Sequence, residues 1–235
     1  MFNSIKVRIS DLNIEINYNF KRIPELCQDY ICDFNNADIK VEYDEQKCKS
    51  ESEKSGFSIN ASEFSCIYRQ IAEQLPFFSR AVCHGAVISY KDNGYMFIAK
   101  SGTGKTTHIN LWQKYISGTK VINGDKPIIE LKNEKVIAYG TPWSGKERMQ
   151  NNTSAKLKGI CLVRQSKQNS IRKLDKKEAL DAIIKQIYMP ENSQALNLTI
   201  GIIDGIISDV PFYELSCDIS REAVMCSYRA LTGEK

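Results

Sequence analysis

The chain has 235 residues, 42% of them hydrophobic, and its 32 basic and 28 acidic residues give a net charge of +4. This length favours one main domain of about 150 residues with a small appended region over two full-sized domains. Because the lysines are scattered along the chain and form no single stripe, neither a nucleic acid nor a membrane surface is expected as a partner.

The cysteines and the N-terminus indicate the compartment. None of the eight cysteines belongs to a Cys-x-x-Cys pair and several lie in apolar runs, so reduced core thiols are expected. The first ten residues lack the basic and apolar regions of a signal peptide, and no apolar run approaches the about 20 residues that cross a bilayer. A cytoplasmic protein is therefore predicted. With two histidines and no Cys/His cluster, a zinc site is not expected.

The N-terminal quarter is predicted to form strands followed by a helix. Residues 5–18 and 38–43 alternate between apolar and polar side chains with the period of half-buried strands. Residues 44–56 are rich in Ser, Lys and Glu without an apolar period, which predicts an exposed loop. Apolar residues recur at helical spacing over 61–78, behind the candidate caps Asn60 and Ser62. We predict a small β-rich region over residues 1–60 and a main domain over 61–235.

The main domain is predicted to contain both strands and helices. The runs 86–90 and 95–99 flank Lys-Asp-Asn-Gly, whose Asn-Gly pair predicts a tight hairpin. This hairpin predicts an α/β fold with a mixed, partly antiparallel sheet. The basic segment 164–177 is expected to be a solvated loop. The further predicted elements are helix 106–115, strand 120–123, hairpin 127–131 with 135–139, strand 157–164, helices 176–188 and 192–208, strand 212–217 and helix 220–231.

Residues 99–106 carry the strongest motif of the chain. They match the phosphate-loop pattern G-x-x-x-x-G-K-[ST], with Ala99 in place of the first Gly, between a strand and a helix. Backbone N–H groups of residues 102–106 would converge on phosphates at a helix N-terminus, where unpaired donors and the helix dipole favour negative charge. A glycine-rich turn with a fortuitous Lys is the alternative. The residues expected to bind ATP are Ser101, Gly102, Thr103, Gly104, Lys105, Thr106 and Thr107.

Within this loop, Lys105 would bridge the β- and γ-phosphates, and the Thr106 hydroxyl would ligate Mg²⁺.

The motif Ser-Gly-Thr-Gly-Lys-Thr-Thr at 101–107 resembles the nucleotide loop of ATP-dependent phosphoenolpyruvate carboxykinases, and HPr kinase/phosphorylases carry a similar Ser-Gly-x-Gly-Lys-Ser. HPr kinases also place a His-Gly before the hairpin, as His84-Gly85 does here, and an acidic pair after the next strand, where this chain has Asn-Gly-Asp-Lys at 123–126. The resemblance covers about residues 80–165, and the chain looks like the small HPr-kinase-like proteins.

That resemblance implies a sheet of the carboxykinase/HPr-kinase type. It also implies an ATP- and Mg²⁺-dependent kinase that transfers the γ-phosphoryl to a hydroxyl of a peptide, a protein or a small molecule. A nucleotide-gated protein that recruits a partner without phosphorylating it is the alternative. Carboxykinase activity comes third, because no metal-binding His/Lys pair and no Arg for a carboxylate substrate can be located. The acceptor stays unassigned, and self-association is left open.

Asp125 and His84 are the candidate catalytic residues beside Lys105. Asp125 ends a strand about twenty residues past the loop, where a carboxylate would hold Mg²⁺; a turn Asp that caps a hairpin is the alternative. HPr kinases have a second Asp, the general base, where this chain has Gly124. Either Asp125 serves both roles or His84 supplies the base, and a structural role for His84 is equally well supported. His108 is expected to be a surface or packing residue.

The segment 140–148 follows a strand and combines turn formers, one aromatic residue and two cations. Such a loop suits an anionic or peptidic second substrate, with Trp143 as a wall and Lys146 or Arg148 meeting phosphate. An ordinary exposed turn is the alternative.

Overall fold

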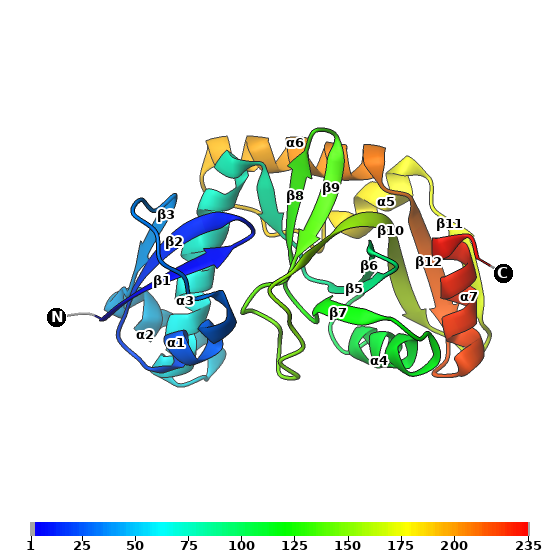
Figure 1. Ribbon diagram of the computed structural model, residues 1–235, viewed down its shortest axis with the longest axis horizontal. Coiled ribbons are helices and arrows are strands. Elements are labelled where there is room, and N and C mark those ends of the chain that lie inside the picture. Colours follow the sequence, from blue (N-terminus) through cyan, green and yellow to red (C-terminus); the bar gives the residue numbers. More distant parts are fainter. Residues whose placement is uncertain (1–2, 235) are drawn as a thin grey trace.

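The computed structural model describes residues 3–234, a mixed α/β fold in which a small N-terminal sheet stands beside a larger mixed sheet (Figure 1). In the small sheet, the first two strands form an antiparallel hairpin that turns at Ser10 and Asp11, and the third strand adds in parallel. Every second side chain of these strands is buried, which confirms the predicted alternation. The elements of this part are β1 (Asn3–Ile9), β2 (Leu12–Tyr18), α1 (Arg22–Leu26), η1 (Gln28–Tyr30), β3 (Ile39–Glu42), α2 (Glu45–Ser55), α3 (Ile59–Gln74) and η2 (Leu75–Phe78).

Helix α2 occupies the segment that was predicted to be an exposed loop, so that prediction is wrong. Asp44 caps the helix by accepting a hydrogen bond from the Lys47 N–H at 3.0 Å, and Gly56 ends it in the left-handed conformation. Only Cys48 is buried, so the helix shows no apolar period in the sequence. Helix α3 is capped by Ser58 and begins at Ile59, two residues before the predicted start.

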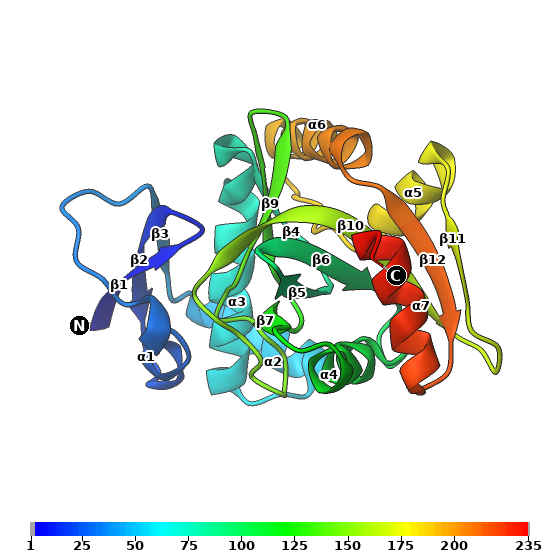
Figure 2. The same cartoon turned by 45° about the vertical axis from the view of Figure 1, so that its right-hand side comes forward.

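The main sheet has nine strands, ordered β4-β8-β9-β10-β6-β5-β7, with β12 and then β11 branching from β10. The long strand β10 arches across the sheet (Figure 2). Its first residues pair with β9 and its last with β12 along one edge, while its other edge pairs with β6. The strands are β4 (Arg80–Val82), β5 (Ala86–Tyr90), β6 (Asn93–Ile98), β7 (Lys120–Asn123), β8 (Ile128–Lys132), β9 (Lys135–Tyr139), β10 (Ser154–Gln165), β11 (Ser170–Lys173) and β12 (Phe212–Cys217).

Both predicted hairpins are present, but the turn of the first is shifted. Lys91 and Asp92 adopt the positive φ angles, 47° and 59°, and the Asn-Gly pair instead begins β6. The basic segment 164–177 is a solvated loop only in part, because β10 extends to Gln165 and β11 pairs with β12.

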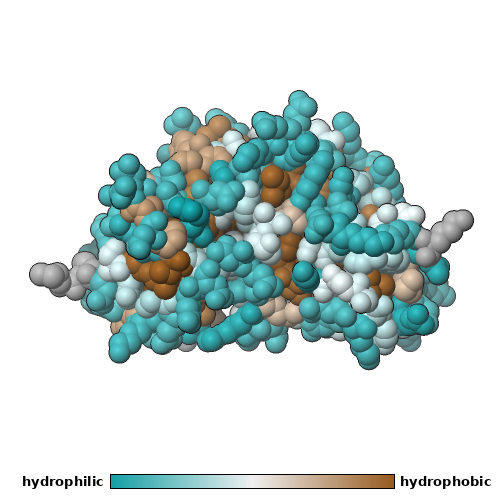
Figure 3. Space-filling view, in the orientation of Figure 1, coloured by the Kyte–Doolittle hydropathy of each residue, from teal (hydrophilic) through white to brown (hydrophobic). Residues whose placement is uncertain are grey.

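Helices cover both faces of the main sheet. Along β6, Met96 and Ile98 pack into the same core as α5 (Lys176–Ile183) and α6 (Ser193–Asp209). Tyr95 and Phe97, on the opposite face, pack against α4 (Lys105–Tyr115) and α7 (Arg221–Thr232). Figure 3 shows that the face seen in Figure 1 is mostly hydrophilic, with small apolar areas separated by polar ones. Among residues 3–234, no helix combines the length and the apolar character needed to cross a membrane.

Candidate functional site

One end of the main sheet brings together the segments that carry the motifs. Strands β6 and β7 both run antiparallel to β5, so their C-terminal ends lie beside the N-terminal end of β5. The glycine-rich loop (residues 99–104) follows β6, Asp125 follows β7, and His84 precedes β5. Strand β10 is parallel to β6 and adds Gln165, whose Nε2 donates to the Thr103 carbonyl oxygen at 3.2 Å. The strand directions therefore determine which residues meet.

The glycine-rich loop leads into an N-terminus of α4 that no side chain caps. Gly102 and Gly104 have φ angles of 79° and 106°, which other residues rarely adopt. Every other helix of at least 8 residues between residues 3 and 234 has a side-chain N-cap. The first N–H groups of α4 are thus open to an anion. In the motif, Ser101, Gly102 and Thr107 are exposed, Thr103, Gly104 and Thr106 are half-buried, and Lys105 is buried.

The structure brings Lys105, His84 and Asp125 into one cluster. The Lys105 Nζ donates to the Ala99 carbonyl oxygen at 3.2 Å and lies 3.2 Å from His84 Nε2. The same His84 nitrogen lies 3.3 Å from Asp125 Oδ1. One ring nitrogen cannot accept from Lys105 and donate to Asp125 at once, so its protonation selects between these two neighbours.

Burial and charge act in opposite directions within this cluster. Burial lowers the pKa of the Lys105 ammonium, and the charge of Asp125 offsets part of that effect. Burial by itself would raise the pKa of the Asp125 carboxyl, but the hydrogen bond with His84 and the charges of Lys126 and Lys105 hold it below its ordinary value. A buried lysine whose pKa is shifted beside an ionised carboxylate is typical of functional sites.

Asn123 fixes the direction of the residues that follow β7. Its buried Oδ1 accepts hydrogen bonds from the N–H groups of Asp125 and Lys126, at 2.9 and 2.8 Å, and its Nδ2 donates to the Thr141 carbonyl oxygen at 3.0 Å. This clamp brings the Lys126 Nζ to 3.8 Å from Asp125 Oδ2. Sequence reasoning missed Lys126, although its place directly after Asp125 was a usable signal.

Gly124 is closely surrounded. Its N–H donates to the Met149 carbonyl oxygen at 2.8 Å, and an added Cβ would lie 3.2 Å from Met149 Cβ and 3.3 Å from the Ser144 carbonyl oxygen. An acidic side chain at this position, such as HPr kinases carry, would meet the 144–149 loop.

The predicted substrate loop, residues 140–148, divides into a buried and an exposed half. Trp143 is 4% exposed, and its ring lies 5.7 Å from that of Phe64 and 5.2 Å from that of Tyr68. It packs in the core and joins α3 to the main sheet, which leaves little of its surface for the predicted role as a wall of the substrate site. Lys146 and Arg148 are exposed. Gly145, the residue before Lys146, packs against Asp125.

Two clefts flank the glycine-rich loop. The first, of about 560 Å³, extends from Gly102 and Gly104 past the apolar side chains of Leu111, Val163 and Ile219. The second, of about 680 Å³, extends from Thr103 to α5 and has a charged lining. It reaches Gln186, whose carbonyl oxygen accepts the His84 N–H at 2.7 Å. The charged residues of the second cleft are Lys100, Arg164, Arg172, Glu178, Asp181, Lys185 and Glu214.

The oxygen donors of Thr106 and Asp125 fit a magnesium ion that a bound nucleotide would also ligate. Within residues 3–234, no three His, Cys, Asp or Glu side chains gather in a way that could hold a metal. Magnesium in nucleotide sites typically takes one or two protein ligands and completes its shell with phosphates and water. Both Asp125 oxygens already have partners, His84 and Lys126, so a metal ion bound there would take the place of one of them.

Comparisons with known proteins give a distant structural relationship and no match in sequence. No protein-family model matches the sequence, and no curated protein matches it. Among solved structures, the chain is similar to the HPr(Ser) kinase/phosphatase from Coxiella burnetii, with 12% identity and a TM-score of 0.38 over 65% of this chain and 92% of that chain. Because this similarity is distant, an argument about activity must come from the geometry of the site.

Proposed function

We propose that the protein is an ATP- and Mg²⁺-dependent kinase that transfers the γ-phosphoryl to a hydroxyl group, with residues 99–106 as its P-loop. The observation that carries this proposal is the buried Lys105 at the uncapped start of α4, in contact with His84 and, through it, with Asp125. Phosphoryl transfer needs positioned cations and N–H donors more than covalent chemistry by the protein. The loop and the cluster supply both.

The two clefts suggest how the substrates would lie. The apolar cleft suits a nucleoside, with its phosphates along residues 102–106. Lys105 would exchange its contacts with Ala99 and His84 for the β- and γ-phosphates, and Thr106 and Asp125 would hold the Mg²⁺ that neutralises phosphate charge. The acceptor would then approach the γ-phosphate from the side of His84 and Asp125.

The transfer step is an in-line displacement. The acceptor oxygen forms a bond to the γ-phosphorus while the bond to the β–γ bridging oxygen breaks, and ADP leaves with that electron pair. The hydroxyl proton passes to His84 or to Asp125, whose side chains are 34% and 27% exposed and therefore within reach of an acceptor.

Mg-ATP binding to a Lys105→Met variant tests this function. The methionine keeps the buried stem but removes a charge-assisted hydrogen bond worth about 1.5–3 kcal/mol, so we expect affinity to fall about 10- to 100-fold by calorimetry. The melting temperature should not fall, because a desolvated cation is replaced by an apolar group. Lys114→Met, at the exposed end of the same helix, is the control. Equal Mg-ATP affinity in folded Lys105→Met and wild type would remove the loop from the site.

A nucleotide-gated recruiting protein is the second candidate, and the crowding at Gly124 favours it because a second carboxylate there would require the 144–149 loop to shift. Tight Mg-ATP binding without phosphate transfer to any tested hydroxyl, or to water, would support this candidate over the kinase.

A further inference from the structure

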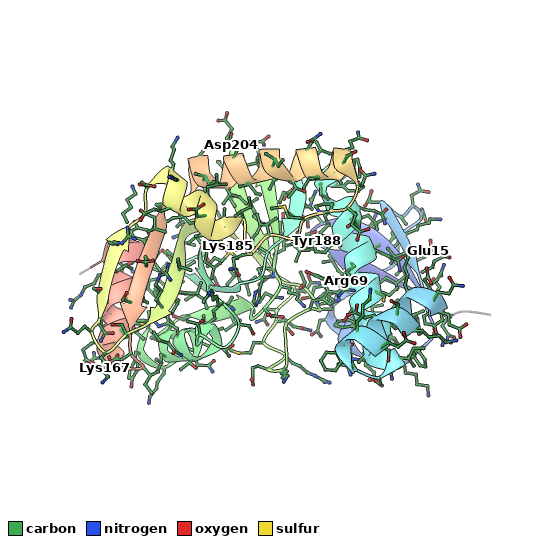
Figure 4. All side chains as sticks on the ribbon, turned by 180° about the vertical axis from the view of Figure 1, so that it is seen from behind. Glu15, Arg69, Lys167, Lys185, Tyr188 and Asp204 are labelled. Carbon is green, nitrogen blue, oxygen red and sulfur yellow. The ribbon has the colours of Figure 1, made fainter. Side chains whose placement is uncertain are left out.

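Tyr68, on helix α3, lies beside the cluster although it comes from the N-terminal part of the chain. Its ring is 5.2 Å from that of Trp143 and 6.3 Å from that of Tyr188, measured between centroids. The Tyr188 hydroxyl donates to Glu73 at 2.8 Å, which fixes that second ring. Figure 4 shows Tyr188 between α5 and α3 on the back of the molecule, close to Arg69. Tyr68 is therefore held on two sides by aromatic neighbours.

The face of the Tyr68 ring is occupied by Lys126. The Lys126 Nζ lies 5.0 Å from the ring centroid, within the range of a cation–π interaction. The Lys126 N–H donates to Asn123 Oδ1 at 2.8 Å and to the Trp143 carbonyl oxygen at 3.1 Å. These bonds hold the main chain of Lys126, and the ring holds its ammonium group. The otherwise flexible Lys126 side chain is therefore confined near Asp125. The side chain is still 39% exposed, so its donors remain accessible to a ligand.

The two oxygens of Asp125 separate Lys126 from Lys105. Oδ1 lies 3.3 Å from His84, which in turn contacts Lys105, and Oδ2 lies 3.8 Å from Lys126. Lys105 belongs to the glycine-rich loop, and Lys126 contacts Asp125 through the oxygen that does not face His84 and Lys105. In an in-line transfer the acceptor arrives on the side opposite the leaving ADP. A cation there meets the phosphoryl group as it moves toward the acceptor.

We propose that Lys126 is a second phosphoryl-binding cation on the acceptor side of the site, and that Tyr68 is the residue that positions it. The proposal rests on the proposed kinase function. It gives the N-terminal part of the chain a role in the site through α3. The roles differ, because Lys126 would touch the transferring group whereas Tyr68 acts through Lys126.

The test uses Mg-ADP with and without aluminium fluoride, which takes the place of the transferring phosphoryl beside ADP. Calorimetry gives the affinity for Mg-ADP alone and the gain in affinity when aluminium fluoride is added. A residue that contacts only the transferring group should change the gain and leave the Mg-ADP affinity unchanged. No acceptor needs to be known for this measurement.

We expect Lys126→Met to reduce the gain about 100-fold, in line with the loss of one transition-state donor, with Mg-ADP affinity changed less than about 3-fold. Lys126→Arg should retain most of the gain. Tyr68→Leu should reduce it about 2- to 5-fold, which is the worth of an exposed cation–π contact, and Tyr68→Phe should restore it because the ring face is kept.

Two matched controls keep the result specific. Phe64→Leu removes a ring that contacts the same Trp143 from the same helix, and Lys114→Met removes a lysine that lies 5.1 Å over the Tyr115 ring, at the other end of α4 from the glycine-rich loop. Both should show the wild-type gain. A wild-type gain in folded Lys126→Met, or no gain in a wild type that binds Mg-ADP, would overturn the inference. If the wild type does not bind Mg-ADP at all, the proposed kinase function fails first.

Discussion

His108 is a histidine of helix α4 that belongs to the core and not to the surface. Its Nε2 lies 3.0 Å from Ser227 Oγ, which accepts from Trp112 Nε1 at 2.8 Å and donates its own hydrogen to the Val224 carbonyl oxygen at 2.9 Å. With that hydrogen used, His108 Nε2 must be the donor. Its Nδ1 is then an unprotonated, buried atom without a partner within residues 3–234. Protonating this ring would bury an unpaired charge.

The stability of the protein should therefore depend on pH through His108. Burial lowers its pKa from 6.5 to about 4, so between these values the unfolded chain binds a proton that the native state does not. Stability falls as pH decreases through this window, by on the order of 3 kcal/mol in total, and this contribution levels off below pH 4. Urea unfolding from pH 7 to 4.5 should show a steeper loss for wild type than for His108→Gln. Parallel curves would contradict it.

Gly140, at the end of β9, shows how closely backbones meet near the site. A Cβ there would lie 1.8 Å from the Asn151 carbonyl oxygen and 2.8 Å from that of Ile122. The Asn151 N–H donates to the Ile122 carbonyl oxygen at 3.0 Å. The ends of β7 and β9 and the 151–153 segment thus pack main chain against main chain, and together they support the turn that carries Asp125.

Gly140→Ala should destabilise the protein by about 3 kcal/mol, because the neighbouring atoms are backbone and cannot move aside. Gly201→Ala is the matched control on the exposed side of α6, where nothing lies within 4 Å of the added Cβ. There the loss of unfolded-state entropy should stabilise by about 0.5–1 kcal/mol. Urea denaturation measures both, and a neutral Gly140→Ala would show that the segments are free to separate.

The elements with a clear apolar period were predictable, and those without one were not. Strands β7 and β12 match their predicted bounds, because apolar residues and turn signals define both ends. Helix α2 was missed because only Cys48 faces the core, although Asp44 and Gly56 are good cap signals. At the site, the motif residues could be identified from local sequence. Tyr68 could not, because its contact with Lys126 depends on how α3 packs against the main sheet.

The two sheets share one core and a buried polar network. Val82, Ile128 and Trp143 of the main domain pack with the strands β1–β3 and with α3. Arg80 pairs with Glu130 at 2.8 Å and donates from Nε to the Ser10 carbonyl oxygen at 3.0 Å, which ties the β1–β2 turn to β8. The predicted boundary at residue 60 stays a prediction, but the contacts extend across it. We expect the whole chain to unfold in one cooperative transition.

Breaking the buried pair should therefore weaken the entire molecule. Arg80→Met leaves Glu130 buried without its cation, so we expect a loss of about 3–5 kcal/mol in the free energy of unfolding. The double variant Arg80→Met/Glu130→Leu should recover most of this loss, because both charges are gone. Chemical denaturation followed by tryptophan fluorescence and by circular dichroism measures the change. Two separate transitions, or a single variant as stable as wild type, would contradict the shared-network description.

The main chain around His84 is bound to a segment a hundred residues further along. The His84 N–H donates to the Gln186 carbonyl oxygen at 2.7 Å, and the Tyr188 N–H donates to that of Val82 at 2.9 Å. The His84 amide proton is thus shielded by the connection between α5 and α6, not by its own strand. Its exchange with deuterium would report each detachment of that connection, at a position next to Lys105 and Asp125. Any ligand that slows this exchange by binding α5 is thermodynamically coupled to the imidazole, and the coupling is reciprocal.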